Sequence, residues 1–299
     1  MRFIELFAGI GGFRYGLERV QFENEELHEP TTAIRDKKGQ CKQQFNRSNQ
    51  RLFNCVYANE IDKYACQIYR KNFGEGELYG GDIRNITTKA IPDHDLLVGG
   101  FPCQAFSIAG KRKGFNDTRG TLFFEICRIA KVKKPRLLLL ENVKGLLNHE
   151  GGATFRTILL SLSELGYDCE WEVLNSKNFG VPQNRERVFI IGHLRGTGGG
   201  QVFPIGEGNG KYYDKQVQEF SRSYPRPRFH VSDSERTRRK IQSGLNIRRL
   251  TPTECERLQG FPDGWTEGLS DTQRYKCLGN AVTTNVIMEI GKRILENYE

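Results

Sequence analysis

The sequence contains eight cysteines but no Cys-x-x-Cys pair and no short cluster of cysteine and histidine. Structural zinc sites and small disulfide frameworks need such spacings, so neither is indicated, and we expect no metal site. We therefore expect reduced thiols, as is usual in the cytoplasm. With 299 residues, the chain is long enough to bury a sizeable core without metal or disulfide support.

Long apolar runs are missing as well. No stretch approaches the length that crosses a bilayer, and Met1 to Glu5 enter an apolar strand without a basic region or a cleavage site. These features predict a cytoplasmic protein with no membrane association. We also expect it to be a monomer.

Acidic residues are scarce in one segment. Between Ser221 and Arg249, nine basic residues face only two acidic ones, a local charge of +7 in a chain of net charge +9. Eight of the nine are arginine, whose paired N–H groups suit phosphate and guanine edges. Arg236, Arg238 and Arg239 are therefore candidate nucleic-acid contacts, and a solvated basic face is the alternative.

Apolar strands alternate with helices along most of the chain. We predict strands at 2–7, 53–59, 96–99, 137–141, 169–174 and 188–192, and helices at 62–73, 122–131 and 155–165. This order is typical of an α/β fold with a mostly parallel, Rossmann-like sheet covered on both faces. The alternation stops after residue 193, and a Gly-, Pro- and Arg-rich tract follows. The polar residues 21–52 are expected to loop out of the fold.

The motif Pro102-Cys103-Gln104 comes shortly after the apolar run 96–98. Open α/β sheets bind ligands at the carboxyl ends of their strands, which is where this cysteine is expected. A thiolate is a strong carbon nucleophile, and Pro102 stiffens the loop that presents it. Cys103 is thus a candidate nucleophile, and a buried, inert thiol is the alternative.

A glycine turn at Gly9–Gly12 connects the first strand to a helix. Arg14 stands where a dinucleotide fingerprint has its third glycine, so NAD is disfavoured, although such a turn still brings backbone close to a nucleotide-like ligand. Glu60 ends the second strand, where a carboxylate can accept from ribose hydroxyls. Asp82 follows a third strand, where it can accept from an adenine amino group. A turn or cap role is the alternative for both carboxylates.

Four leucines precede Glu141, which is expected to emerge from an apolar strand at the same edge as Cys103. Partial burial would raise its pKa and let it donate a proton near neutral pH, and a turn-capping carboxylate is the alternative. Arg185 and Arg187 lie on one face of an extended segment, where they can clamp a phosphate or a base carbonyl. The alternative is a surface ion pair with Glu186 or a neighbour.

In order and spacing, these motifs closely resemble the cytosine-5 DNA methyltransferases that use S-adenosylmethionine, of the bacterial restriction-modification type. The resemblance covers the chain except residues 21–52 and about 194–247. It rests on Phe7-Ala8-Gly9-Ile10-Gly11-Gly12, Asn59-Glu60, Gly81-Asp82-Ile83, Gly100-Phe101-Pro102-Cys103-Gln104, Glu141-Asn142-Val143, Gln183-Asn184-Arg185-Glu186-Arg187, Arg249-Leu250-Thr251-Pro252, Gly260-Phe261-Pro262 and Leu278-Gly279-Asn280-Ala281-Val282.

The resemblance implies a cofactor, S-adenosylmethionine, with S-adenosylhomocysteine as its product. The implied cofactor residues are Phe7, Gly9, Gly11, Glu60, Asp82, Ile83, Pro102, Leu122, Asn280 and Val282. It also implies a covalent reaction, in which Cys103 adds to C6 of a flipped cytosine and Glu141 stabilises the protonated N3. Arg185 and Arg187 would orient the base. Gln104 and Ser107 would line the space that the base leaves in the DNA.

The implied architecture is a class I methyltransferase fold. Residues 1–193, completed by 273–299, would form the catalytic, cofactor-binding domain, and residues 194–272 a small target-recognition lobe. The implied partner is double-stranded DNA of a specific sequence, and a cognate restriction endonuclease would act on the same site.

One departure from the family pattern keeps alternatives open. The region between the arginine motif and Arg249 is short for the family. A DNA-binding protein with impaired turnover is one alternative, and a tRNA cytosine-5 methyltransferase with the same cysteine and glutamate is another. A folate-dependent thymidylate-type enzyme shares the addition to C6, but the adenosine-type pocket argues against it.

Overall fold

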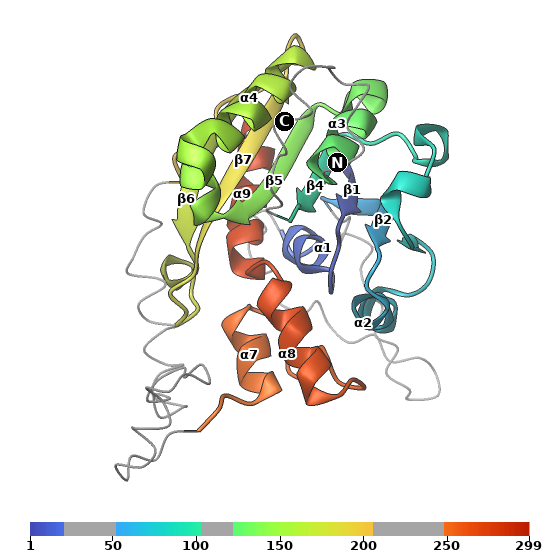
Figure 1. Ribbon diagram of the computed structural model, residues 1–299, viewed down its shortest axis with the longest axis vertical. Helices are drawn as coiled ribbons and strands as arrows, with labels where there is room; N and C mark the ends of the chain where they lie inside the picture. The colour runs from blue at the N-terminus through green and yellow to red at the C-terminus, as the bar shows by residue number, and fades with distance from the viewer. Residues whose placement is uncertain (21–51, 103–121, 206–247, 299) are drawn as a thin grey trace, which may run out of the picture.

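The computed structural model describes residues 1–20, 52–102, 122–205 and 248–298. Its centre is a seven-stranded sheet of order β3-β2-β1-β4-β5-β7-β6 (Figure 1). The strands are β1 (Arg2–Leu6), β2 (Asn54–Glu60), β3 (Leu78–Gly80), β4 (Leu96–Gly100), β5 (Leu137–Val143), β6 (Tyr167–Asn175) and β7 (Glu186–Leu194). Strands β1 to β5 pair in parallel, and β7 runs antiparallel to β5 and β6. The mostly parallel α/β sheet that the sequence predicts is confirmed.

The central strands are mostly apolar because both faces of the sheet are covered. Side chains alternate between the two faces along a strand, so a strand buried on both sides is apolar throughout. Val98 and Leu139 pack into the core on one face, and Leu97 and Leu138 pack into the core on the other. All four leucines from 137 to 140 are 0% exposed. The predicted strands at 96–99 and 137–141 are thus the two central strands that lead to the candidate site.

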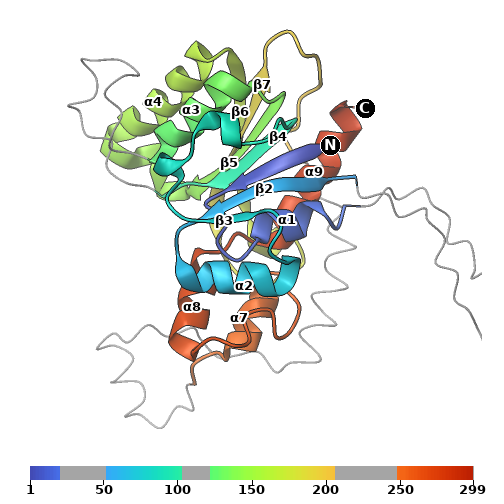
Figure 2. The same ribbon diagram turned by 90° about the vertical axis from the view of Figure 1, so that its right-hand side faces the viewer.

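Helices cover the two faces of this sheet. The longer ones are α1 (Gly12–Leu17), α2 (Lys63–Phe73), α3 (Leu122–Lys133), α4 (Ala153–Glu164), α7 (Pro252–Leu258), α8 (Asp271–Asn280) and α9 (Thr284–Tyr298). Short 3₁₀ turns include η1 (Ile83–Asn85), η5 (Lys144–Gly152) and η6 (Ser176–Asn178). Helices α3 and α4 pack on one face, and α1 and α9 on the other (Figures 1 and 2).

Helix α9 joins the core although it is far away in sequence. A Cβ at Gly16 of α1 would meet Ile287 Cβ at 2.6 Å, and one at Gly291 of α9 would meet Val20 Cγ2 at 2.9 Å. Glycine at these two positions therefore lets the helices approach closely. The connection between α8 and α9 is thereby held near the glycine turn that follows β1.

Helices α7 and α8 are docked against the same turn. Trp265, in the loop between them, donates from Nε1 to the carbonyl of Ile10 at 3.1 Å, and its ring lies 5.5 Å from that of Phe73. Lys71 Nζ donates to the carbonyls of Gly264 and Glu267 at 2.9 and 3.0 Å. The loop between α7 and α8 thus packs against the glycine turn and is hydrogen-bonded to α2.

The sequence pattern did not predict the direction of β7. Only residues 176–185 separate β6 from β7, and the crossover between parallel strands usually needs a dozen residues or more. The chain therefore returns as an antiparallel hairpin, and Arg187 lies opposite Val143 at the end of β5. This reversal brings the arginine motif to the edge of the sheet where β5 ends.

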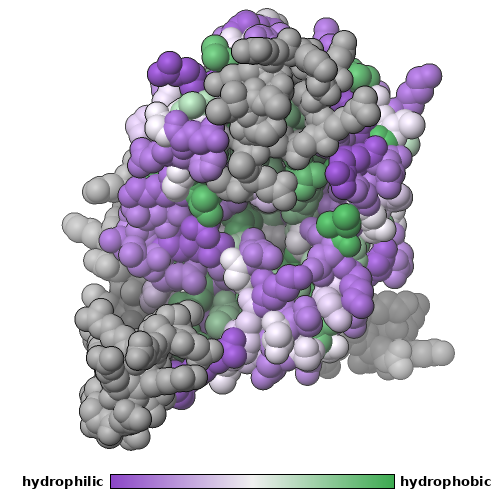
Figure 3. All heavy atoms as spheres, viewed as in Figure 1, coloured by the Kyte–Doolittle hydropathy of each residue, from purple (hydrophilic) through white to green (hydrophobic). Residues whose placement is uncertain are grey.

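The described ranges contain neither a membrane-spanning helix nor a cluster of metal-binding side chains. Those ranges hold no helix long and apolar enough to cross a membrane, and no group of three or more His, Cys, Asp or Glu that could hold a metal ion. Figure 3 shows a mostly hydrophilic face with small, separate hydrophobic patches.

Candidate active site

The candidate site forms where β4 and β5 end. Gly100, the last residue of β4, pairs with Glu141 of β5. A Cβ at residue 100 would lie 3.1 Å from Glu141 Oε2, so glycine leaves room for the carboxylate. The described chain ends here at Pro102. Cys103, Gln104 and Ser107 lie outside the described residues, and the predicted nucleophile stays a prediction.

Asn142 ties the two strand ends together. Its Nδ2 donates to the carbonyl of Phe101 at 2.8 Å, and its Oδ1 accepts from the backbone N–H of Val143 at 2.8 Å. The residue is 2% exposed, so water does not replace either bond if it is lost. Asn142 therefore fixes the backbone just before Cys103. In the sequence this residue is visible only as part of a motif, because an amide after a carboxylate does not reveal which backbone group it will bind.

Glu141 and Arg187 form an ion pair. Glu141 Oε1 lies 3.0 Å from Arg187 Nε, and the two side chains are 14% and 21% exposed. Burial raises the pKa of Glu141, and Arg187 and Arg185 act against that rise. A raised pKa lets a carboxyl group keep its proton to higher pH than a free glutamate does. The alternative pairing with Glu186 is wrong for Arg187, because Glu186 pairs with Lys144 at 3.0 Å.

Arg185 is held by the connection between α8 and α9. Its Nη2 donates to the carbonyls of Gly279 and Ala281 at 3.1 and 2.8 Å, whereas its buried Nε has no hydrogen-bond partner among the described residues. Burial and the charge of Arg187 lower the pKa of Arg185 to about 10, against the effect of Glu141. The unpaired N–H can donate to a carbonyl or anionic oxygen of a ligand.

Glu60 organises the turn that follows β1. The backbone N–H of Gly9 donates to Glu60 Oε2 at 2.7 Å, and those of Ile61 and Asp62 donate to Oε1 at 2.8 and 2.7 Å. A carboxylate has about four lone-pair positions, so Oε2 retains one for a ligand hydroxyl. A Cβ at Gly9 would meet no described atom within 4 Å, so open space borders this part of the backbone.

Phe7 and Gly11 both have positive φ angles in this turn. Phe7 has φ 56°, which is rare for a bulky residue and is found mainly where function or packing imposes it. Gly11 has φ 82°, and a Cβ there would collide with the ring of Phe73. Packing against Phe73 is thus sufficient to require glycine at position 11. The predicted close approach of the cofactor to Gly11 stays a prediction.

Asp82 and Ile83 follow β3. Asp82 accepts from the backbone N–H of Arg84 at 3.0 Å, and its Oδ2 lies 2.5 Å from the guanidinium of the same residue. These hydrogen bonds hold the pKa of Asp82 below its usual range. Ile83 is 2% exposed and belongs to the core beneath α3. Asp82 therefore has the cap role named as its alternative, and cofactor binding by either residue stays a prediction.

The remaining predicted cofactor residues lie around the same edge of the sheet. Asn280 is exposed at the end of α8, Pro102 is exposed after β4, and Leu122 is half-buried at the start of α3. Val282 is 7% exposed and packs against Gly12, whose Cβ would lie 2.8 Å from Val282 Cγ1. Val282 thus packs against the start of the helix that follows the glycine turn.

Two exposed apolar residues next to the site were missed. Ile61 follows Glu60 and is 66% exposed, and Val143 ends β5 and is 41% exposed. Exposed apolar side chains beside candidate binding groups are available for contact with a ligand. Sequence alone could not separate them from core residues, because both extend apolar strands. Ile61 is a candidate contact for a ligand bound at Glu60.

A buried charged cluster under the glycine turn was also missed. Glu5 is 0% exposed in β1 and accepts from the backbone N–H groups of Phe13 and Arg14 at 3.2 and 3.4 Å and from Tyr69 Oη at 3.2 Å. Burial raises the pKa of Glu5 to about 8, although its hydrogen bonds and the charge of Arg14 act in the opposite direction. The signal in the sequence was a glutamate inside the otherwise apolar strand 3–6.

We expect Glu5→Gln to flatten the pH dependence of stability between about pH 4.5 and about pH 8. The folded protein keeps this proton up to a pKa of about 8, whereas the unfolded chain releases it near the ordinary value of 4.5. The wild-type protein therefore loses free energy of unfolding as the pH rises through this window, by an amount on the order of several kcal/mol. Glutamine has no charge to bury. Urea unfolding at about pH 6 and about pH 9 measures the difference.

The control for Glu5→Gln is Glu164→Gln, at an exposed position at the end of α4. The control should keep the wild-type pH dependence. Equal pH slopes for Glu5→Gln and the wild type would show that Glu5 is ionised in the folded protein at neutral pH.

Known proteins are similar to this chain in sequence and in fold. The family described as C-5 cytosine-specific DNA methylase matches residues 1–205 and 201–296. Type II methyltransferase M1.ScrFI of Lactococcus lactis subsp. cremoris is 37% identical over 341 residues, which cover 100% of this chain and 79% of that protein. Type II methyltransferase M.HhaI of Haemophilus parahaemolyticus is 34% identical over 340 residues, covering 98% of this chain and 94% of that protein.

Among solved structures, the S. pombe Dnmt2 methyltransferase has a TM-score of 0.64 and 21% identity, covering 99% of this chain and 98% of that one. This likeness supports the fold. The relationship that the sequence motifs predict is confirmed by the family match and by the type II relatives. The chain therefore belongs to the C-5 cytosine-specific DNA methylase family and is a DNA cytosine-5 methyltransferase of the restriction-modification type.

Proposed function

We propose that this methyltransferase transfers a methyl group from S-adenosylmethionine to C5 of a cytosine flipped out of a specific double-stranded DNA sequence. The reaction passes through a covalent bond between Cys103 and C6 of the base. The observation that carries this proposal is the Glu141–Arg187 ion pair of 3.0 Å, set beside the end of the strand that leads to Cys103. It places a carboxyl group whose pKa is raised by burial beside a cation at one edge of the sheet.

The chemistry of cytosine explains why these groups are needed. C5 is a poor nucleophile until the Cys103 thiolate adds to C6, which opens the C5–C6 double bond and makes C5 enamine-like. Protonated Glu141 donates its proton to N3, which stabilises the adduct, and takes the proton back when the adduct collapses. S-adenosylmethionine, when bound, supplies the methyl group to C5. Loss of the C5 proton to a base and expulsion of the Cys103 thiolate then restore the double bond.

Base flipping is needed because the target carbon is inaccessible inside a duplex. We propose that Arg185 and Arg187 orient the flipped base through its O2 and the adjacent phosphate. The unpaired Nε of Arg185 supports this role. Gln104 and Ser107, next to the nucleophile, would fill or line the space that the base vacates.

The described residues fit an adenosyl cofactor. Glu60 retains an acceptor position on the open side of Gly9, and Ile61 presents an apolar surface beside it. We propose that Glu60 binds the ribose and Asp82 the adenine. The full set proposed to hold the cofactor is Phe7, Gly9, Gly11, Glu60, Asp82, Ile83, Pro102, Leu122, Asn280 and Val282.

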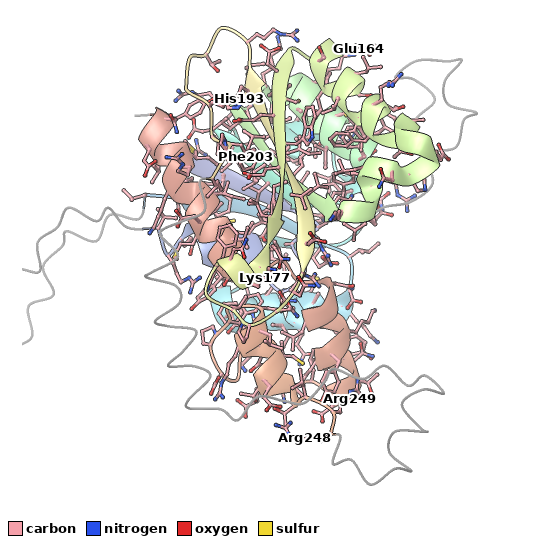
Figure 4. The ribbon with its side chains drawn as sticks, turned by 90° about the vertical axis from the view of Figure 1, so that its left-hand side faces the viewer. Glu164, Lys177, His193, Phe203, Arg248 and Arg249 are labelled. Carbon is pink, nitrogen blue, oxygen red and sulfur yellow. The ribbon has the colours of Figure 1, made fainter. Side chains whose placement is uncertain are left out.

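Glu60→Ala and Asp82→Ala are each expected to weaken S-adenosylmethionine binding about tenfold or more. Each variant loses a charge-assisted hydrogen bond, worth about 1.5 to 3 kcal/mol. Glu60→Ala should have the larger effect because it also releases three backbone N–H groups. Titration calorimetry measures the affinity, with Glu164→Ala, at an exposed position at the end of α4, as control (Figure 4). Wild-type affinity in both variants would remove these carboxylates from the pocket.

Target recognition is proposed to lie in residues 194–272, beside a catalytic domain formed by 1–193 and 273–299. Arg236, Arg238 and Arg239 of this lobe lie outside the described residues. Arg248 and Arg249 lie beside α7 and α8, far from Glu164 (Figure 4). The Arg249 guanidinium is 3.7 Å from the centre of the Tyr275 ring. This cation–π contact holds the positive charge of Arg249 at the border of the lobe.

An Arg236/Arg238/Arg239→Ala variant is expected to reduce the salt dependence of DNA binding. The log–log slope of affinity against salt is about −0.9 for each neutralised phosphate, so the triple variant should flatten it by up to about 3 units. Cofactor affinity should stay unchanged. Arg293→Ala, which breaks an exposed ion pair with Glu296 near the end of α9 in the catalytic domain, is the control and should keep the wild-type slope. A wild-type slope in the triple variant would identify the tract as a solvated face.

One assay separates the proposed activity from its two alternatives. Purified protein is incubated with labelled S-adenosylmethionine and either duplex DNA or tRNA, and the label in each product is measured. We expect label in duplex DNA. Label in tRNA alone would identify a tRNA methyltransferase, and DNA binding without transfer would identify a protein with impaired turnover. A cognate endonuclease, a monomeric state and a cytoplasmic location stay predictions.

A further inference from the structure

A buried chain of polar groups connects three separate segments to Arg185. Thr283 Oγ1, just before α9, lies 2.8 Å from Gln259 Oε1 after α7 and 2.8 Å from Ser176 Oγ in η6. The backbone N–H of Ser176 donates to the carbonyl of Arg185 at 3.0 Å. Gln259 and Ser176 are each 3% exposed and Thr283 is 2% exposed, so water does not substitute for these bonds.

The number of hydroxyl protons fixes which group donates and which accepts in each of these hydrogen bonds. Gln259 Nε2 donates to the carbonyl of Leu278 at 3.1 Å, which assigns Oε1 as an acceptor. The single hydroxyl proton of Thr283 therefore goes to Gln259, and its oxygen accepts the hydroxyl proton of Ser176. The contact from Ser176 Oγ to the Arg185 carbonyl is longer, at 3.3 Å. The orientation of each hydroxyl group in this series of hydrogen bonds thus depends on the orientation of the next.

Two of these segments hold the two ends of Arg185. Ser176 binds its backbone carbonyl, and the carbonyls of Gly279 and Ala281 bind its guanidinium at 3.1 and 2.8 Å. Arg187 follows in the same extended segment and pairs with Glu141. A displacement of Arg185 would therefore be passed on to the Glu141–Arg187 ion pair.

We propose that Thr283 is a positioning residue whose hydroxyl, acting through Ser176, fixes Arg185 and so places Arg187 against Glu141. The inference rests on the proposed function, in which Glu141 and the two arginines contact the cytosine. Thr283 acts only through these residues. It differs from a packing residue because the hydroxyl, rather than the volume of the side chain, carries the effect.

The test compares Thr283→Val, which keeps the volume and removes the hydroxyl, with Thr283→Ser, which keeps the hydroxyl. The valine variant is expected to lower kcat about tenfold or more, because small displacements of catalytic groups are costly. Affinity for S-adenosylhomocysteine should change less than about threefold, since its proposed charged contacts are elsewhere. Thr283→Ser should recover most of the activity. The control is Thr157→Val, which loses a similar hydroxyl bond inside α4 and should keep wild-type kcat.

The pH profile separates positioning from general destabilisation. Arg187 and Arg185 face Glu141 and lower its pKa, and the Lys144–Glu186 ion pair lies on neighbouring residues. If Thr283→Val loosens the arginines, the pKa of Glu141 rises. The decline of kcat at alkaline pH should then move to higher pH. A variant that is only less stable would lose active protein without moving this decline.

Hydrogen exchange tests the inference independently of activity. Thr283→Val should speed exchange of the Ser176 amide and of the start of β7, whereas Thr283→Ser and Thr157→Val should not. Wild-type exchange in the valine variant would overturn the inference, as would equal loss of kcat in the valine and serine variants. If the wild type transferred no methyl group, the proposed function would fail, and exchange would still decide whether Thr283 positions Arg185.

Discussion

Replacing Cys103 by alanine is expected to abolish methyl transfer while leaving cofactor affinity nearly unchanged. The thiolate is the group proposed to add to C6, and without it C5 does not become nucleophilic. The proposed adenosyl contacts come from other segments, around Glu60 and Asp82. Methyl transfer to duplex DNA and calorimetry with S-adenosylhomocysteine measure the two effects on the same preparation.

Covalent trapping sharpens the Cys103 experiment. Duplex DNA with 5-fluorocytosine at the target position should form a stable adduct with the wild type and none with Cys103→Ala. Cys169→Ala is the matched control, because Cys169 is a half-buried cysteine in β6 whose burial raises its pKa to about 12. It should both trap and methylate. Methyl transfer by Cys103→Ala, or no adduct with the wild type, would contradict the covalent route.

Glu141→Gln is expected to lower methyl transfer by about 10² to 10⁴, the usual contribution of a positioned acid or base. The amide keeps the shape of the side chain but cannot transfer a proton to N3. It also removes the charge that pairs with Arg187. Single-turnover methyl transfer measures the loss, and DNA binding should change much less.

The control for Glu141→Gln is Glu186→Gln, which removes a nearby carboxylate that pairs with Lys144. That variant should keep most of the activity. Because burial raises the pKa of Glu141, its protonated form persists to higher pH than in a free glutamate, and wild-type activity should decline above that pKa. Similar losses of methyl transfer in both variants would show that the reaction depends on the negative charge at this edge of the sheet rather than on proton transfer by Glu141.

The sheet could be predicted from local patterns because its central strands are buried on both faces. The run 137–140 is apolar at every position, and that pattern was sufficient to identify β5. The direction of β7 was harder to predict, because it depends on the length of the chain after β6 and on pairing with β5. The antiparallel direction of β7 determines which residues form the site, because it brings Arg187 to Glu141.

In the candidate site, too, residues marked by the local sequence could be predicted, and residues defined by distant partners could not. Glu60 stood out because it ends a strand, and Glu141 because it follows four leucines. Asn142, Glu5 and Thr283 did not, because their partners are far away in the sequence or are backbone groups. Asn142 reaches Phe101, Glu5 reaches the start of α1, and Thr283 reaches Gln259 and Ser176. Such contacts become visible only when the fold places the segments together.

Bisulfite sequencing of DNA from cells that express this chain tests the central claim most directly. Methylation should be found at cytosines of one short duplex sequence, and it should be absent from cells that express Cys103→Ala at the same level. Unmethylated DNA in cells with abundant, folded wild-type protein would contradict the account, as would equal methylation in cells that express the alanine variant.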